Sequence, residues 1–307
     1  MRGIDMTGGK FWKRIKRSRQ LHWIILLPMA FIVFFNFVPM PGIALAWKRY
    51  IATKGIYGSP SVGWDNFKAL FSYPMFWPAF WNTLSIACLK LAIGFPVPIL
   101  TALLLNEVGS KAFKKTAQTL MYLPYFLSWV VLGGIIMSLF SLDGGINSLL
   151  QAVGFPPVFW LGKAGWFIFM LVFTEIWKNF GYGTIIYLAA LTGIDKNLYE
   201  AAAIDGAGRW KQTLHITVPG VLPIAALMGI LNLGTVLNAG FEQIFILNNA
   251  LVAERATIID TLVYDVTFAD RNYGMATAMN LFKSVISFAL ILSGWFLANR
   301  YSDYRVF

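Results

Sequence analysis

The stretch EAAAIDGAGRWKQTLHITVP, residues 200–219, lies between two long apolar runs. Asp195, shortly before it, can cap a helix, and the three consecutive alanines favour helix formation. Gly206 and Gly208 permit a sharp change of direction, because glycine adopts left-handed dihedral angles freely. Pro219 then marks the entry to the next apolar run. We therefore expect a rigid elbow, made of two short helices and a tight turn, between two apolar helices.

The composition indicates a membrane protein. Of 307 residues, 58% are hydrophobic and 13% are charged, whereas a soluble domain is about 45–50% apolar and about 25% charged. The net charge of +11 would suit a nucleic-acid-binding protein, but in so apolar a chain the positive-inside bias of membrane proteins explains it better. We expect no nucleic-acid partner. The single cysteine, Cys88, excludes a disulfide framework and a thiolate metal site.

Six apolar runs are long enough to cross a bilayer, which requires roughly 20 residues. Their approximate bounds are 23–46, 80–105, 117–140, 165–192, 219–247 and 274–298. The sequence therefore predicts an all-α integral membrane protein with six transmembrane helices. A basic segment, 1–22, precedes the membrane domain, 23–307, and the elbow belongs to the loop 193–218.

The distribution of Lys and Arg predicts the orientation. With the N-terminus in the cytoplasm, fifteen Lys and Arg residues fall on the cytoplasmic side and seven on the outer side. Because cytoplasmic loops carry the excess of positive charge, both termini and the loop 193–218 are predicted to be cytoplasmic. The outer side then carries the longer loops 47–79, 141–164 and 248–273.

Polar side chains within the last three runs follow helical spacing, and in the fifth run Thr235, Asn238 and Glu242 fall on one stripe, with Asn232 at its edge. In the fourth run Glu175 and Lys178 are three residues apart and can pair directly. A charge at bilayer depth costs at least about 2.5–3.5 kcal/mol, so it normally faces protein or a wet cavity. We therefore predict a polar pathway between these helices. Its candidate residues are Glu175, Asn179, Tyr182, Asn238, Glu242, Asn280 and Lys283.

Two alternatives stay open at this point. Any one of these polar residues can instead hydrogen-bond between helices without touching a substrate. Lys90, in the middle of the second run, either pairs with a neighbouring helix or marks a water-accessible face.

The elbow resembles a known motif. Glu-Ala-Ala at 200–202, followed by Gly206, Ile216 and Val218-Pro219, is similar to the "EAA" loop of importer-type ABC transporter permeases, although that pattern usually ends in Leu-Pro. Other stretches resemble the oligosaccharide and polysaccharide branch of the family, which includes importers of alginate fragments. They are VPMPGIALAWKRY (38–50), GSPSVGWDNF (58–67), LLLNEV (103–108), YLPYFLSWVV (122–131), NAGFEQIF (238–245) and LFKSVIS (281–287).

The resemblance implies a type I ABC importer permease fold in the bacterial cytoplasmic membrane. It implies a complex with a second, homologous permease and two ATPase subunits, to which a solute-binding protein delivers a glycan. The elbow would be the coupling helix that docks in an ATPase cleft. The residues that correspond to this role are Glu200, Ala201, Ala202, Asp205, Gly206 and Arg209. Trp177, Tyr182 and Phe241 are candidates for stacking on sugar rings.

The sequence itself contains no GxxxxGK[ST] phosphate loop and no HExxH motif, so we expect no ATP, metal or other cofactor bound by these motifs. ATP and Mg²⁺ would be bound by the ATPase partners, and no catalytic residue is predicted. The alternative is a polytopic membrane enzyme that acts on lipid-linked sugars with its intramembrane carboxylates. That alternative leaves the elbow unexplained.

Overall fold

A computed structural model describes residues 19–301. They form helices and connecting loops, with one isolated antiparallel bridge between Lys48 and Ser61. The prediction of an all-α protein is therefore confirmed for this part of the chain. The basic segment 1–22 lies mostly outside the described residues.

The first half of the chain contains the first three apolar runs. Its longer helices are α2 (Arg19–Ile32), α4 (Asp65–Ser72), α5 (Phe76–Gly94), α6 (Pro96–Glu107), α7 (Lys111–Tyr122), α8 (Trp129–Leu139) and α9 (Gly145–Ala152). The α2 helix continues through a π-helical turn, Val33–Phe37, and a 3₁₀ segment, Met40–Trp47. Pro96 begins α6, where its missing N–H breaks no helical bond.

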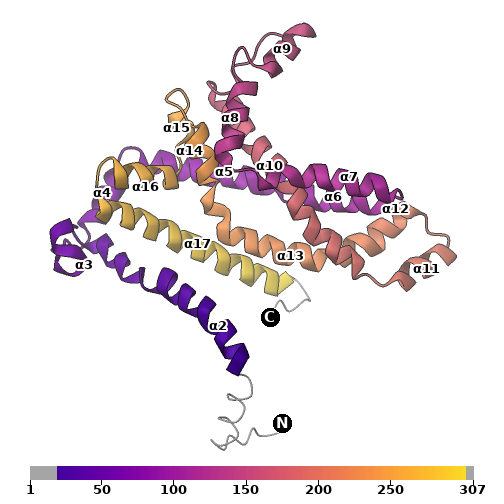
Figure 1. Cartoon of the computed structure of the whole chain (residues 1–307), viewed down its shortest axis with the longest axis horizontal. Helices are drawn as coiled ribbons and strands as arrows, with labels where there is room; N and C mark the ends of the chain where they lie inside the picture. The colour runs from indigo at the N-terminus through magenta and orange to yellow at the C-terminus, as the bar shows by residue number, and fades with distance from the viewer. Residues whose placement is uncertain (1–18, 302–307) are drawn as a thin grey trace, which may run out of the picture.

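The second half contains the elbow and the helices of the loop 248–273. Its helices are α10 (Ala164–Thr192), α11 (Lys196–Ile204), α12 (Arg209–Gln212), α13 (Val218–Thr235), α14 (Phe241–Leu247), α15 (Ala253–Ala256), α16 (Ile259–Phe268) and α17 (Tyr273–Tyr301). The short helix α3 (Gly55–Gly58) lies near α4 and the start of α17 (Figure 1).

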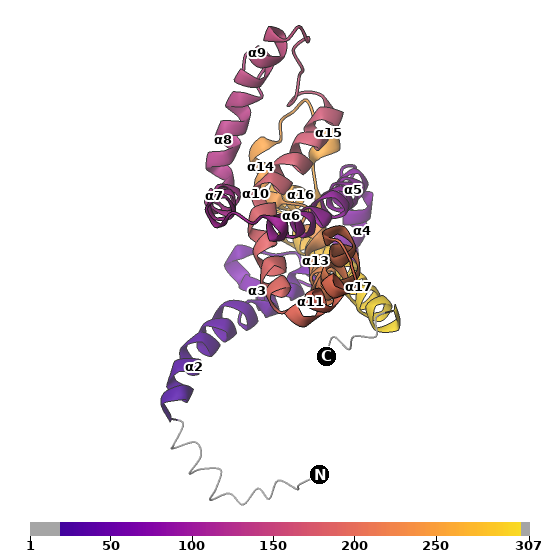
Figure 2. The ribbon, with the colours of Figure 1, turned by 90° about the vertical axis from the view of Figure 1, so that its right-hand side faces the viewer.

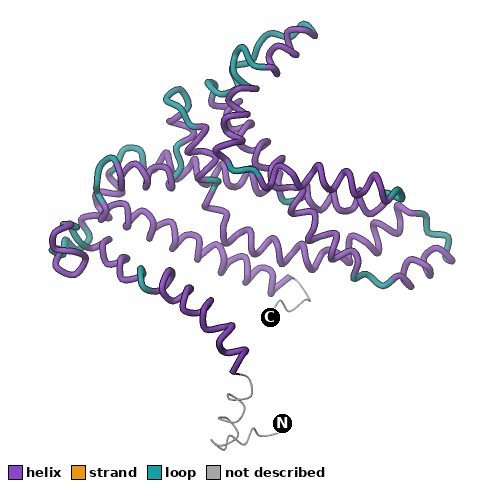
Figure 3. The backbone as a smooth tube through the Cα atoms, in the orientation of Figure 1, coloured by secondary structure: helices purple, strands orange, loops and turns teal. Residues whose placement is uncertain are grey.

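The helices α5, α6, α13 and α17 run lengthwise through an elongated bundle (Figures 1 and 3). The elbow helices α11 and α12 lie at one end of the bundle, and α3, α4 and α16 lie at the opposite end. Helices α8 and α9 project away from the bundle in both views, and α2 leaves it on the other side (Figures 1 and 2). The apolar side chains from Trp23 to Val38 are all exposed.

Four helical segments within the described residues are long and apolar enough to cross a membrane: Trp23–Trp47, Phe76–Glu107, Arg209–Leu247 and Tyr273–Phe296. A fifth candidate, Lys111–Phe126 with Trp129–Leu139, is bent by 102°, so the predicted straight span 117–140 is wrong in shape. The 29-residue helix α10 is not among the apolar spans, because the polar residues within it lower its hydropathy. The number of six spans therefore remains a prediction.

Three apolar clusters hold the bundle together. One joins α5, α8, α10 and α14 around Ile86, Leu132 and Leu171. A second joins α4, α5, α16 and α17 around Leu70 and Met279. The third joins α6, α10 and α13. Helices α5 and α10 each contribute to two of the three clusters, so these two helices join the parts of the bundle.

Helix α10 approaches α7 most closely at Gly181. A Cβ atom at this position would collide with the carbonyl oxygen of Met121, a backbone atom that cannot rotate away. Glycine is therefore required here by close packing between two helices, as small residues commonly are inside membrane bundles.

We expect Gly181→Ala to destabilise the protein by about 1–3 kcal/mol, the usual effect of overpacking. Gly165→Ala is the matched control, because it lies on the same helix and its Cβ would meet nothing within 4 Å. Thermal unfolding of the two purified variants in detergent measures the difference. Equal melting temperatures would contradict the close approach of α7 and α10.

Candidate functional site

The elbow has the helix–turn–helix geometry that its residues predict. The carboxylate of Asp195 accepts a hydrogen bond from the backbone N–H of Asn197 at 3.0 Å and so caps α11. At the other end, Ala207 N–H donates to the Ala202 carbonyl at 2.8 Å and Gly206 N–H donates to the Ala203 carbonyl at 3.1 Å. These two bonds are a Schellman motif with Gly206, at φ +77°, in its left-handed position. Gly208 has φ −66° and needs no such freedom.

The outer surface of the elbow is available to a partner. Glu200, Ala201, Asp205, Gly206 and Arg209 are exposed, and Ala202 is half-buried. Two apolar side chains that sequence reasoning missed stand beside them: Ile204 is 86% exposed and Trp210 is 77% exposed. Exposed large apolar side chains around a rigid turn are typical of a protein-binding surface.

The elbow is attached to the bundle on its inner side. The hydroxyl of Tyr199 lies 3.0 Å from the hydroxyl of Thr217, at the start of α13. A Cβ on Gly220 would meet the side chain of Ile194, so α13 packs closely against the end of α10. A displacement of α11 is therefore transmitted to both long helices.

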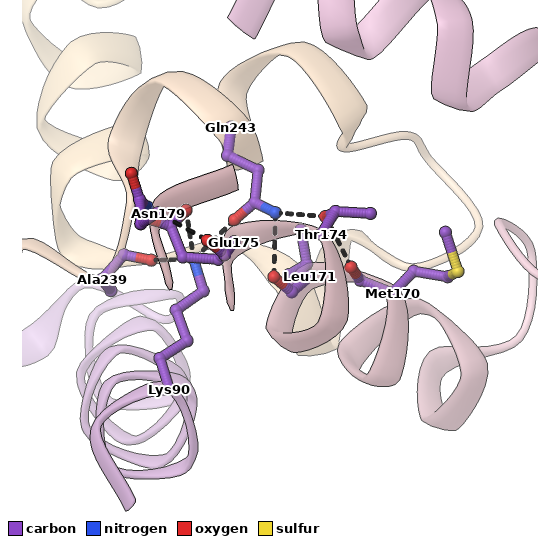
Figure 4. A network of polar contacts seen from close by, with 8 residues as sticks. All are labelled: Lys90, Met170, Leu171, Thr174, Glu175, Asn179, Ala239 and Gln243. Carbon is purple, nitrogen blue, oxygen red and sulfur yellow. Dashed lines mark hydrogen bonds and ion pairs between the residues drawn. The ribbon is translucent and has the colours of Figure 1, made fainter. Parts of the chain in front are cut away.

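A second candidate site is the polar network around Lys90, inside the bundle (Figure 4). The Lys90 ammonium donates to the Ala239 carbonyl at 2.8 Å and to the side-chain oxygen of Gln243. It also lies 3.5 Å from Oε2 of Glu175. The other Glu175 oxygen accepts from Nδ2 of Asn179 at 2.7 Å. The network therefore joins α5, α10 and the segment that follows α13.

Gln243 fixes this network to α10 from the other side. Its Nε2 donates to the Leu171 carbonyl at 2.8 Å and to the Thr174 hydroxyl at 2.7 Å. Both Gln243 and Thr174 are buried. The side-chain donors and acceptors of Gln243 and Lys90 all have hydrogen-bond partners. A polar network that is fully hydrogen-bonded in this way is rigid.

The helical backbone is interrupted after α13, at the point where Lys90 binds. Helix α13 ends at Thr235, a 3₁₀ turn follows, and Ala239 (φ +45°) and Gly240 (φ +90°) are both left-handed before α14 begins. A helix break inside a bilayer exposes carbonyl groups that must find donors. The Lys90 ammonium supplies one at the negative end of the broken helix.

The network forms one wall of a cavity of about 470 Å³, within the range of small-molecule sites, about 300–1,000 Å³. Among its lining residues, Glu175, Asn179 and Asn238 are predicted pathway residues. Asn232 and Thr235, which the sequence placed on the stripe of Asn238 but not among the seven candidates, lie on the same wall. Aromatic lining comes from Phe95, Phe180 and Tyr187, and not from Trp177 or Phe241.

The remaining pathway candidates lie elsewhere. Tyr182 stacks on Tyr125 with a ring separation of 4.0 Å, so it packs α10 against the bend after α7. Glu242 and Asn280 are exposed but do not line the cavity. Glu242 is separated from Asn238 by the break before α14, which disrupts the regular helical stripe that predicted their shared face.

Lys283 does not line the cavity either. Its ammonium is held by both oxygens of Asp260, at 2.6 and 2.8 Å, and by Oδ1 of Asn238 at 3.0 Å. It therefore connects helix α16 to α17 and to the wall of the cavity. Asp260 was not predicted, because a carboxylate on a helix between two apolar runs carries no sequence signal for a partner on another helix.

The predicted pair between Glu175 and Lys178 is wrong. Lys178 instead donates to the carbonyl groups of Tyr125 and Leu127, at 2.8 and 2.7 Å, while Glu175 pairs with Lys90. Lys178 thus satisfies the carbonyls at the bend between α7 and α8. The open question about Lys90 is answered in favour of a neighbouring helix.

These features define a class: a helical, multi-pass membrane protein with an exposed helix–turn–helix elbow and a polar cavity between its helices. Residues 94–303 match the model of the family described as "Binding-protein-dependent transport system inner membrane component", and the chain belongs to this family. It is therefore a multi-pass component of a bacterial inner membrane transport system.

Individual relatives agree along nearly the whole chain. Protein LplB of Bacillus subtilis (strain 168) is 37% identical, over 98% of this chain and 96% of the relative. The polygalacturonan/rhamnogalacturonan transport system permease protein YteP of the same organism is 39% identical, over 96% of this chain and 92% of the relative. A chain from the crystal structure of a bacterial ABC transporter involved in alginate import has a TM-score of 0.87 and 35% identity, over 96% of this chain and all of that chain.

We expect Lys90→Met to destabilise the protein strongly. Removing one partner of a buried pair costs about 3–5 kcal/mol, and here the substitution also leaves the Ala239 carbonyl without its donor. The double variant Lys90→Met/Glu175→Gln should recover part of the loss, because it removes the unpaired carboxylate. Thermal unfolding in detergent measures both.

The control is Lys68→Met, which removes a cation from the exposed pair with Asp65 and should cost no more than about 1 kcal/mol. If Lys90→Met were as stable as Lys68→Met, the ammonium would not be holding the break before α14.

Proposed function

We propose that the chain is the permease subunit of an ABC importer for an oligosaccharide or polysaccharide. The observation that supports this most directly is the exposed elbow, in which the Glu-Ala-Ala segment leads into a Schellman turn at Gly206. The names of relatives support a glycan cargo: one belongs to a polygalacturonan/rhamnogalacturonan system and one to an alginate importer.

The proposed topology has six transmembrane helices, with both termini and the loop 193–218 in the cytoplasm. The end of α6 supports this arrangement, because Asn106 and Glu107 share a cavity with Lys196 and Arg209 of the elbow. The two loops that are predicted to be cytoplasmic, 106–116 and 193–218, therefore meet at one end of the bundle. In this proposal residues 1–22 form a cytoplasmic basic segment and residues 23–307 form the permease domain.

The proposed partners are a second, homologous permease, two ATPase subunits and a solute-binding protein. A relative of this fold crystallised with an alginate pentasaccharide-bound periplasmic protein supports the last of these. ATP and Mg²⁺ would bind to the ATPase subunits, so this chain is proposed to be non-catalytic. Glu200 would face a cation of the ATPase, and Ile204 and Trp210 would fill apolar pockets around it.

The cavity around Glu175, Asn179 and Asn238 would be this chain's share of the glycan pathway. Carboxylate and amide groups can bind sugar hydroxyls, and the nearby aromatic rings can pack on the apolar faces of sugars. The second permease would supply the opposite wall.

We expect Gly206→Val to impair coupling, because a β-branched residue is strained at positive φ. A left-handed L-residue costs roughly 1–2 kcal/mol, so ATP hydrolysis stimulated by the solute-binding protein should fall roughly five- to thirty-fold. Gly208→Val is the matched control, since both glycines have open space around them and Gly208 has a negative φ. Similar stimulation in the two variants would contradict a role for the left-handed turn.

Reversing Glu200 tests the partner itself. We expect Glu200→Lys to lose co-purification of the ATPase, because it replaces an attraction by a repulsion, whereas Lys211→Glu on the neighbouring helix should retain it. The measurement is the amount of ATPase recovered with the tagged permease. Retention of the ATPase by Glu200→Lys would contradict the proposed docking mode, and turnover of a lipid-linked sugar by this chain alone would contradict the proposed function.

A further inference from the structure

The cavity around the Lys90 network contains one positive and one negative side chain, and the two differ in exposure. Among its lining residues only Lys90 and Glu175 are charged. The Lys90 side chain is 10% exposed and the Glu175 side chain is 25% exposed. The cation is therefore shielded by protein, and the carboxylate is the charge that a ligand in the cavity meets.

All three N–H donors of the Lys90 ammonium already have partners. An ammonium group has three donors, and the three partners of Lys90 are the Ala239 carbonyl, the Gln243 side-chain oxygen and Glu175. A carboxylate on a ligand could bind this cation only by displacing one of them. Displacing the carbonyl of Ala239 would also disturb the break between α13 and α14.

The rest of the polar wall is uncharged. Asn179 is held by Glu175 through its Nδ2, and Asn232, Thr235 and Asn238 add amide and hydroxyl groups. The side-chain oxygen of Asn238 accepts a hydrogen bond from Lys283, and Lys283 is itself paired with Asp260. Glu175 accepts hydrogen bonds readily from hydroxyl groups, which carry protons, but not from a deprotonated carboxylate.

We infer that the sugar residue held against this chain's wall of the pathway is uncharged, and that Glu175 excludes a uronate from this position. The inference rests on the proposed glycan import and narrows its substrate class. The cargo is a neutral oligosaccharide, or a mixed glycan that places a neutral residue here. Like charges repel more strongly where protein surrounds them than in bulk solvent, so a uronate carboxylate beside Glu175 would be disfavoured.

The test compares trigalacturonate with its carboxyl-reduced counterpart, which differs only in the C6 group. Binding of each sugar is measured calorimetrically on the intact complex of both permeases and both ATPases in lipid nanodiscs, without the solute-binding protein. We expect the reduced trisaccharide to bind about tenfold more tightly. Glu175→Gln, which keeps an oxygen for Asn179 but leaves Lys90 uncompensated, should remove or reverse this preference.

Asn238→Asp provides a second variant that retains an acceptor for Lys283 and adds a negative charge to the wall. It should widen the preference for the reduced sugar several-fold, and it keeps the test decisive if Glu175→Gln fails to fold. Tighter binding of trigalacturonate, an unchanged preference in the variants, or binding of neither sugar would overturn the inference. Failure of the proposed function would be seen in other experiments: Glu200→Lys would still co-purify with the ATPase, and Gly206→Val would still show normal stimulation of ATP hydrolysis.

Discussion

The arrangement of the bundle depends on one buried ammonium. Lys90 projects from α5 into a region where the fifth apolar run breaks, and it binds the carbonyl of Ala239 at that break. The same group pairs with Glu175 on α10 and with Gln243 on α14. A lysine in an apolar bundle is unfavourable unless all its donors are satisfied. Here that requirement specifies the relative placement of three segments that are far apart in the sequence.

Lys178 donates to unpaired backbone carbonyl groups at a second irregular position in the chain. The chain bends by 102° between α7 and α8, and the carbonyl groups freed at the bend accept hydrogen bonds from Lys178 at 2.7 and 2.8 Å. Its ammonium also lies 5.5 Å from the ring centre of Tyr125, within cation–π range. Irregular backbone is tolerated inside a membrane protein only where protein groups satisfy it. Both discontinuities are therefore consequences of where two lysines lie.

Helix α10 connects these discontinuities to the elbow. It carries Glu175 and Lys178 near its middle, and it ends at Thr192, immediately before α11. Tyr199 and Thr217 attach the elbow to α13 as well, so two of the helices that border the cavity, α10 and α13, are connected to the exposed turn. In the proposed function, these two helices would carry a displacement of the elbow to the cavity wall.

The sequence by itself determined the features that depend on near neighbours in the chain. These are the helical apolar runs, the cap at Asp195, the left-handed turn at Gly206 and the family that the Glu-Ala-Ala segment indicates. Such features follow from propensity, backbone freedom and hydropathy, which act over a few residues. It also identified Glu175, Asn179 and Asn238 as polar residues that an apolar helix would not retain without a reason.

Only the tertiary structure decided which polar groups are partners. Helical spacing favoured Glu175 with Lys178, yet Glu175 pairs with Lys90, 85 positions away, and Lys283 pairs with Asp260 on helix α16. Spacing cannot foresee a break such as the one at Ala239, which disrupts the helical face that linked Asn238 to Glu242. The physical reason is that a buried charge accepts the partner with the best geometry in three dimensions, including backbone carbonyls, and those become available only once the helices have broken and packed.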